Sequence, residues 1–119
     1  MVREVKFARS SRGGSIAYGV EGDGPTVVMT PLLGWDSFGY EEMSPGYRRF
    51  SSTLAQRCRL VQFDVSGVGM SSDSEPVTSL EDMVDDLRAV IESVGSGPVV
   101  VFGRGTFTAV AIELAAERP

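Results

Sequence analysis

The sequence predicts an α/β fold in which helices cover both faces of a mostly parallel sheet. From residue 26 onward, apolar runs alternate with amphipathic segments in the order strand, helix, strand, helix, strand, helix. The apolar runs are continuous, which is typical of strands that are covered on both faces. The 119 residues are enough for one domain, so we expect a single domain over 1–119.

Two candidate strands precede this alternation. Residues 5–10 are short and mixed in character, which favours an edge strand, and residues 15–22 alternate apolar and polar positions as a half-buried strand does. Glycine-rich turns at 12–14 and 22–24 bound the second of them. The later strand candidates are the apolar runs 26–33, 59–64 and 98–102.

Three segments have the apolar spacing of amphipathic helices. They are residues 44–56, 78–95 and 106–119. The second begins with Thr78 and Glu81, which fit the pattern of a capping box. We therefore expect one helix after each of the last three strands.

Composition and charge exclude several classes of protein. The net charge is −5 and the longest basic cluster is Arg48-Arg49, so we expect neither a nucleic-acid partner nor a membrane partner. Nothing resembles a signal peptide or a bilayer span, which favours the cytoplasm. We expect no cofactor and no metal, since no residues have metal-ligand spacing. Cys58 is expected to be buried, and Asp86 to lie on a solvated helix face.

The loops that leave the carboxyl ends of the last three strands are where a ligand would bind in such a sheet. They span residues 31–38, 64–72 and 103–107. The first contains an aromatic cluster of Trp35 and Phe38, continued by Tyr40, which either lines a ligand pocket or covers the core.

In order and spacing, four segments resemble the N-terminal half of the α/β-hydrolase family. Residues 16–34 are similar to its second and third strands and oxyanion loop, and residues 48–64 to its first helix and fourth strand. Residues 99–119 resemble the nucleophile strand, elbow and following helix. The resemblance implies an incomplete three-layer sandwich with strands 1–5 and three helices. The chain also resembles hydrolase-like domains found beside bacterial cyclase or regulatory domains.

The fourth segment is "DVSGVGMSSD", which is similar to the family pattern D-x-R-G-x-G-x-S with Ser66 in place of the arginine. The resemblance implies a structural loop role for the residues that match the pattern. These residues are Asp64, Gly67, Gly69 and Ser71.

The elbow departs from the family pattern G-x-S-x-G, which exposes a nucleophile on a strained turn. Gly103 matches the first glycine, Arg104 takes the first free position, and Gly105 stands in the place of the serine. Thr106 takes the second free position and Phe107 replaces the last glycine, so the local packing must shift. Gly105 accepts a positive φ but cannot attack a carbonyl.

No histidine is present, so the usual general base is missing and we predict no catalytic residue. Thr106 is a weak alternative nucleophile, and its simpler role is to cap the last helix. The resemblance suggests Leu33, Thr106 and Trp35 as oxyanion or ligand-pocket residues. Leu32 stands where the family often has glycine, which changes that loop. A dinucleotide-binding turn at 103–108 lacks its third glycine and its acid.

Three functions follow as alternatives. The chain is a truncated or remnant hydrolase without activity, a regulatory or binding module for a small hydrophobic ligand or ester, or part of an ester or acyl hydrolase that a C-terminal half completes. The family's acid and histidine would follow residue 119. The next strand would too, so the apolar strand 98–102 is expected to have an unpaired edge that favours a homodimer or a partner chain.

Overall fold

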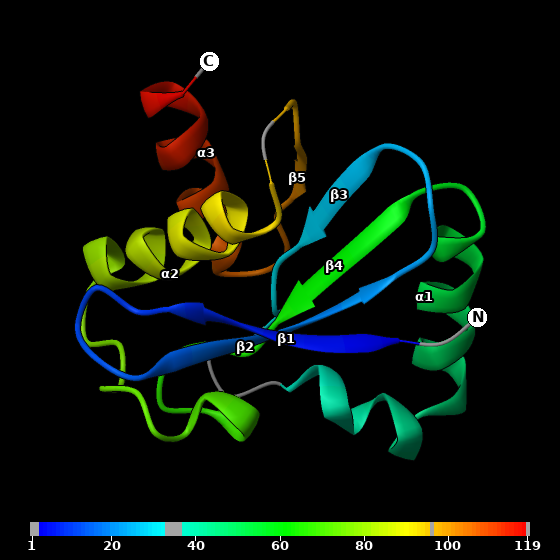
Figure 1. Cartoon of the computed structure of the whole chain (residues 1–119), viewed down its shortest axis with the longest axis horizontal. Coiled ribbons are helices and arrows are strands. Elements are labelled where there is room, and N and C mark those ends of the chain that lie inside the picture. Colours follow the sequence, from blue (N-terminus) through cyan, green and yellow to red (C-terminus); the bar gives the residue numbers. More distant parts are fainter. Residues whose placement is uncertain (1–2, 33–36, 96, 119) are drawn as a thin grey trace.

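A five-stranded sheet forms the centre of the part of the chain that the computed structural model describes, residues 3–32, 37–95 and 97–118 (Figure 1). Its strands lie in the order β1-β2-β4-β3-β5. Strands β3, β4 and β5 are parallel, whereas β1 and β2 form an antiparallel hairpin beside β4. The bounds are β1 Glu4–Arg9, β2 Ser15–Glu21, β3 Thr26–Met29, β4 Arg59–Phe63 and β5 Val100–Phe102.

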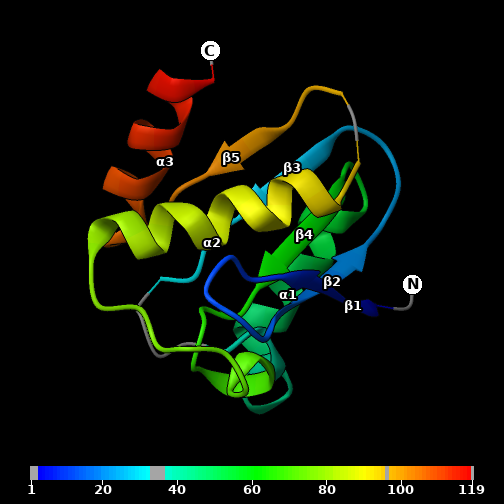
Figure 2. The same ribbon diagram turned by 60° about the vertical axis from the view of Figure 1, so that its left-hand side comes forward.

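Helices cover both faces of this sheet, which confirms the predicted fold class (Figures 1 and 2). Helix α1 (Pro45–Ala55) lies on one face, and α2 (Leu80–Ser93) and α3 (Phe107–Glu117) lie on the other. Two short 3-10 helices, η1 (Phe38–Met43) and η2 (Gly69–Ser71), follow β3 and β4. None of the described helices combines the length and the apolar character needed to cross a membrane.

The central strands alternate their side chains between two cores, as period-two geometry requires. Val28 and Val61 face the larger core, which α2 and α3 cover, whereas Met29 and Leu60 face the smaller core under α1. The buried members of the larger core include Ile16, Tyr18, Phe63, Leu87, Val90, Phe107, Val110 and Leu114. Cys58 is buried in the smaller core, as predicted.

Several predicted boundaries are wrong; the strand predicted over 26–33, for example, ends at Met29. Strand β5 begins at Val100 and not at residue 98, because only residues 100–102 pair with β3. The N-cap of α2 is Ser79 and not Thr78, since the Ser79 hydroxyl accepts a hydrogen bond from the Asp82 N–H at 3.1 Å. Both Thr78-x-x-Glu81 and Ser79-x-x-Asp82 match the broader pattern of Ser or Thr followed three residues later by an acid, so this pattern alone could not choose between them.

Strand β5 presents an apolar surface at the edge of the sheet. Among the described residues it pairs with β3 alone. Val100 is 59% exposed and Phe102 is 38% exposed, and Ile112 of the neighbouring α3 is exposed as well. An unpaired apolar edge of this kind favours association through strand pairing. That a second copy or another chain binds here stays a prediction.

Candidate functional site

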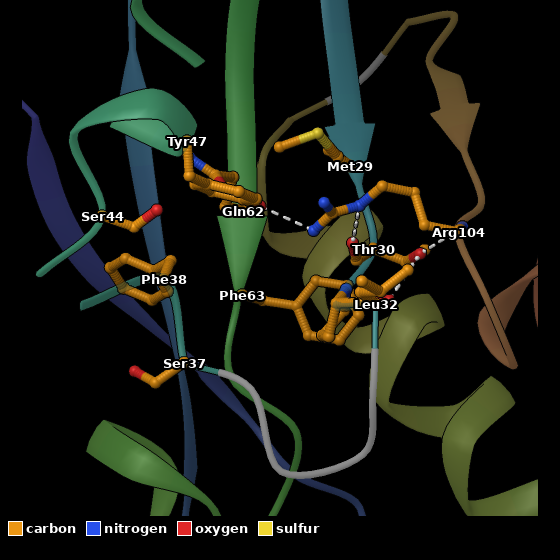
Figure 3. Close-up of a pocket in the computed structure, with 11 residues that line it drawn as sticks. Met29, Thr30, Leu32, Ser37, Phe38, Ser44, Tyr47, Gln62, Phe63 and Arg104 are labelled. Atoms are coloured by element: carbon orange, nitrogen blue, oxygen red, sulfur yellow. Dashed lines mark hydrogen bonds between the residues drawn. The ribbon is translucent and has the colours of Figure 1, made fainter. Parts of the chain in front are cut away.

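A cavity of about 250 Å³ lies at the carboxyl ends of β3 and β4, beside the turn that joins β5 to α3 (Figure 3). This is the position at which α/β sheets bind ligands. Most of its walls are apolar, and Arg104 is its one charged side chain among the described residues. The lining residues are Met29, Thr30, Pro31, Leu32, Ser37, Phe38, Ser44, Tyr47, Gln62, Phe63 and Arg104.

The β5–α3 turn has the backbone of an elbow and no space for a side chain at its tip. Gly105 has a φ of +53°, which glycine adopts readily. A Cβ atom placed on Gly105 would lie 2.3 Å from the carbonyl oxygen of Leu32. The Leu32 carbonyl therefore occupies the volume in which a nucleophile at position 105 would begin. Beside it, a Cβ on Gly103 would lie 2.9 Å from the Cβ of Ala111, so strand and helix also meet closely there.

Arg104 reaches from this turn across the end of β3 into the cavity (Figure 3). Its Nε donates to the carbonyl oxygen of Thr30 at 2.9 Å, and its Nη2 donates to Tyr47 Oη at 2.7 Å. The guanidinium carbon also lies 5.2 Å from the centroid of the Tyr47 ring, within the range of a cation–π contact. Tyr47 Oη in turn donates to Gln62 Oε1 at 3.2 Å. The three side chains form one hydrogen-bonded chain that runs from the β5–α3 turn through α1 to β4.

In the sequence, Arg104 occupies only a free position of the elbow pattern, and no motif marks Tyr47 or Gln62 as site residues. One signal was available. Gln62 is a polar side chain within the otherwise apolar end of β4, and a buried amide needs hydrogen-bond partners. Its partner Tyr47 lies on α1, and the contact between them depends on packing that the sequence does not reveal.

Thr106 lies at the N-cap position of α3, but the predicted cap is wrong. Its hydroxyl makes no capping hydrogen bond, because its φ of −64° and ψ of −23° are helical and not the extended values of a capping residue. The residue is exposed. The neighbouring Phe107 is fully buried, and its ring meets Phe63 edge to face at a centroid distance of 6.1 Å. Phe107 thus contributes its ring to the core. The close approach between the end of β5 and α3 occurs at Gly103 instead.

Asp64 is a fully buried carboxylate at the end of β4. Its Oδ1 accepts from the Phe38 N–H at 2.9 Å, and its Oδ2 accepts from the Ser37 hydroxyl at 2.8 Å and the Met70 N–H at 2.9 Å. Burial raises the pKa of Asp64 above its ordinary value, and the three donors oppose that rise. The carboxylate joins the start of η1 to the start of η2.

The other residues of this loop fit tightly around Asp64. A Cβ on Gly69, which has a φ of +53°, would lie 2.4 Å from Asp64 Oδ2, and one on Gly67 would lie 2.8 Å from Pro76 Cα. The Ser71 hydroxyl accepts from the Ala17 N–H and donates to the Asp64 carbonyl, both at 2.8 Å. The hydroxyl of Ser71 is therefore occupied in joining the loop to β2.

Ser66, which stands where the related pattern has arginine, binds a carboxylate on α2. Its N–H and its hydroxyl both donate to Asp86 at 2.8 Å, and Arg12 from the β1–β2 turn donates to the same carboxylate at 3.1 Å. Asp86 is 1% exposed, so its predicted place on a solvated face is wrong. Burial raises the pKa of Asp86, and Ser66 and Arg12 oppose the rise.

Of the remaining candidate residues, only the side chain of Phe38 can be placed in the structure. Leu33 and Trp35, and the side chain of Tyr40, fall outside the described residues, while Phe38 lines the cavity. Within the described part of the chain, no three side chains of His, Cys, Asp or Glu gather as a metal site would require.

Comparison with known sequences gives a distant similarity. No family model matches the sequence. The curated magnesium-chelatase 30 kDa subunit of Rhodobacter capsulatus is 29% identical over 98 residues, which cover 82% of this chain and 32% of that protein.

Solved structures match almost the whole chain. An α/β hydrolase from Sphaerobacter thermophilus matches 95% of it with a TM-score of 0.74 and 27% identity, and the chain covers 40% of that structure. An α/β hydrolase from Novosphingobium aromaticivorans matches 98% with a TM-score of 0.75, 23% identity and 40% coverage. An epoxide hydrolase from an endophytic Streptomyces matches 98% with a TM-score of 0.74, 21% identity and 34% coverage. The chain thus spans less than half the length of each of these proteins.

Proposed function

We propose that the site of this chain, which has the α/β-hydrolase fold, binds a small, largely apolar ligand without hydrolysing it. One observation carries the proposal. The carbonyl oxygen of Leu32 lies where the first atom of a side chain at position 105 would be, so the elbow is built around glycine. The cavity beside it is retained, with mostly apolar walls.

The hydroxyl groups near the elbow do not replace the missing nucleophile. A hydroxyl attacks a carbonyl only when an adjacent base takes its proton. Thr106 is exposed and has no hydrogen-bond partner among the described side chains, and Ser71 already serves Ala17 and Asp64. The 119 residues contain no histidine that could act as the base.

A second candidate is supported by the length of the matched structures. They are more than twice as long as this chain, and they include hydrolases of epoxides. The chain would then be the N-terminal part of an acyl or ester hydrolase, with further reactive groups supplied by another segment. Gly105 counts against this candidate, because a second segment would not change the tip of the elbow.

The biological setting also stays a proposal. We propose a bacterial, cytoplasmic pseudoenzyme, of the kind found beside regulatory domains. Its acidic charge favours a small-molecule ligand over nucleic acid or a membrane surface as its partner.

The test compares reactivity with binding. We expect no turnover of 4-nitrophenyl acetate or butyrate above background, and no labelling by a fluorophosphonate probe. Gly105→Ser should stay inactive as well, because no base is present and the new side chain meets Leu32. Stoichiometric labelling at Thr106, or turnover in either protein, would contradict the proposal. Binding is measured through the backbone amide resonances of Gln62 and Arg104, which should shift with short amides such as hexanamide.

A further inference from the structure

We infer that the cavity selects a small monocarboxylate, with Arg104 as the residue that binds its anionic group. This inference rests on the proposed function, since it assumes that the cavity binds a ligand without hydrolysing it. The observations that carry it are the unused donors of Arg104 and Gln62, the absence of an acidic lining residue among those described, and the apolar walls.

Some of the N–H donors of the Arg104 guanidinium have no acceptor among the described residues. An arginine side chain carries five N–H donors. Only its Nε and Nη2 have acceptors, on Thr30 and Tyr47, and the described part of the chain provides none for Nη1. No described carboxylate forms an ion pair with Arg104 either. A half-buried guanidinium in a mostly apolar cavity lacks a counter-ion, and a ligand anion would supply one.

The guanidinium is also held in place before any ligand arrives. Thr30 accepts from both the backbone N–H and the Nε of Arg104, each at 2.9 Å. Tyr47 accepts from Nη2, and its ring centroid lies 5.2 Å from the guanidinium carbon. Little side-chain freedom remains to be lost on binding, which favours affinity. A side chain whose only role was to stabilise the turn would not need to reach the cavity.

Gln62 adds a second donor on the same wall. Its Oε1 accepts from Tyr47, which leaves the amide Nε2 as the free end of the side chain, and no described residue accepts from it. Gln62 is 5% exposed, so a cavity ligand is the natural partner for this donor. Among the described lining residues, the cavity thus presents donors from Arg104 and Gln62 and no acidic group. Such a site favours an anion and disfavours a cation.

The apolar walls and the small volume of the cavity indicate that the anion is a carboxylate attached to an apolar group. Met29, Phe38 and Phe63 line the cavity, and Arg104 is its single cation among the described residues, whereas a phosphate dianion would call for more charge. A volume of about 250 Å³ lies below the roughly 300–1,000 Å³ of pockets for drug-sized ligands. A short aliphatic acid or an acid with one ring is therefore the expected size.

The acidic net charge of the chain does not oppose this selection. Charges on the surface are screened beyond about 8 Å at physiological ionic strength. The anion in the cavity would contact the guanidinium directly, so the local cation decides the sign of the interaction.

The experiment compares two pairs of ligands that differ only in charge. Hexanoate and hexanamide, and benzoate and benzamide, are titrated into the whole chain at pH 7 while amide resonances and calorimetry report binding. We expect each carboxylate to bind at least about tenfold more tightly than its amide, as a charge-assisted hydrogen bond predicts. Inorganic phosphate should bind more weakly than hexanoate. Equal affinity of acid and amide, or preference for phosphate, would overturn the inference and leave the proposed function standing.

Variants assign the effect to Arg104. Arg104→Gln should lower the affinity for hexanoate at least tenfold and leave that for hexanamide within twofold. Arg57→Gln is the matched control, because it removes the same charge from an exposed site outside the cavity lining and should change neither affinity. An Arg104→Gln variant that still prefers the acid would refute the assignment. The comparison of ligands on the unmodified chain needs no variant, so it decides the matter if Arg104→Gln does not fold. Failure of all four ligands to bind would instead overturn the proposed function.

Discussion

The loop that follows β4 and the turn that follows β5 both lie at the carboxyl ends of the parallel strands, but they use their polar groups in opposite ways. In the first, the carboxylate of Asp64 and the hydroxyl of Ser71 are buried and form hydrogen bonds with other groups of the chain. In the second, Gly105 and Thr106 are exposed, and Arg104 directs unused donors into a cavity. The polar groups of the β4 loop hold the fold together, while the β5 turn has glycine at its tip and directs the donors of its arginine into the cavity.

This difference separates two reasons for resembling a family. Asp64, Gly67 and Gly69 match the family pattern because each is fixed by close contacts that another residue would disrupt. At position 105 the contact is of the opposite kind, because the Leu32 carbonyl oxygen occupies the space that a side chain would need. The chain therefore combines the α/β-hydrolase fold with an elbow that has no room for a side chain at its tip.

The largest effect should come from Phe107, the residue that replaces the last glycine of the elbow. Phe107→Ala removes a fully buried ring that packs on Phe63, so we expect a loss of about 3–5 kcal/mol in the free energy of unfolding. Ile112→Ala, on the exposed face of the same helix, should change it by less than about 0.5 kcal/mol. Urea unfolding measures both. Equal losses would show that α3 is not anchored through Phe107.

A somewhat smaller effect is expected for the β4 loop. Asp64→Ala leaves the donors of Ser37, Phe38 and Met70 without their acceptor in a buried place, and we expect a loss of about 3 kcal/mol. Asp73→Ala, at an exposed position of the same loop region, is the control and should change stability little. Urea unfolding again provides the measurement. If Asp64→Ala were as mild as the control, the loop would not depend on its carboxylate.

A third prediction separates two reasons why position 105 disfavours a side chain, namely its positive φ and the nearby Leu32 carbonyl oxygen. Gly13 also has a positive φ, of +96°, but a Cβ there would meet nothing within 4 Å. Gly13→Ala should therefore cost about 1 kcal/mol through the backbone alone, whereas Gly105→Ala should cost roughly 2–3 kcal/mol, because its Cβ also meets Leu32. Thermal melts followed by circular dichroism compare the two. Equal shifts would mean that the Leu32 carbonyl moves aside easily, and the elbow could then accept a side chain.

Sequence reasoning predicted the architecture better than it predicted the cavity. The alternation of apolar and amphipathic segments depends on local patterns, and it gave the fold class, the helices on both faces and the three parallel strands. The contacts of the site join residues far apart in the chain, such as Arg104 with Tyr47 and Ser66 with Asp86. Acidic residues on a helix look alike in sequence, so only packing distinguishes the buried Asp86 from its exposed neighbours.

The smallest effect concerns pH and the buried carboxylate of the β4 loop. Burial raises the pKa of Asp64 above its ordinary value of 3.8, against the donors of Met70, Ser37 and Phe38, so the folded chain holds this proton more tightly than the unfolded chain does. The contribution of Asp64 to stability is then fully present below pH 3.8 and is lost as the pH rises through the folded-state pKa. Asp86 acts in the same direction, and Asp82, whose pKa the Thr78 N–H lowers, acts in the opposite one.

Asp64→Asn isolates this contribution, because the amide does not titrate. We expect its free energy of unfolding to improve relative to the unmodified chain as the pH rises from 3.5 toward 7, through the window that opens at about pH 3.8. Asp73→Asn, at an exposed position, should leave the pH dependence unchanged. Urea unfolding at intervals of half a pH unit measures all three proteins. If the stability of Asp64→Asn instead fell relative to that of the unmodified chain as the pH rises, the three donors would outweigh burial, and the folded state would favour the charged form of Asp64.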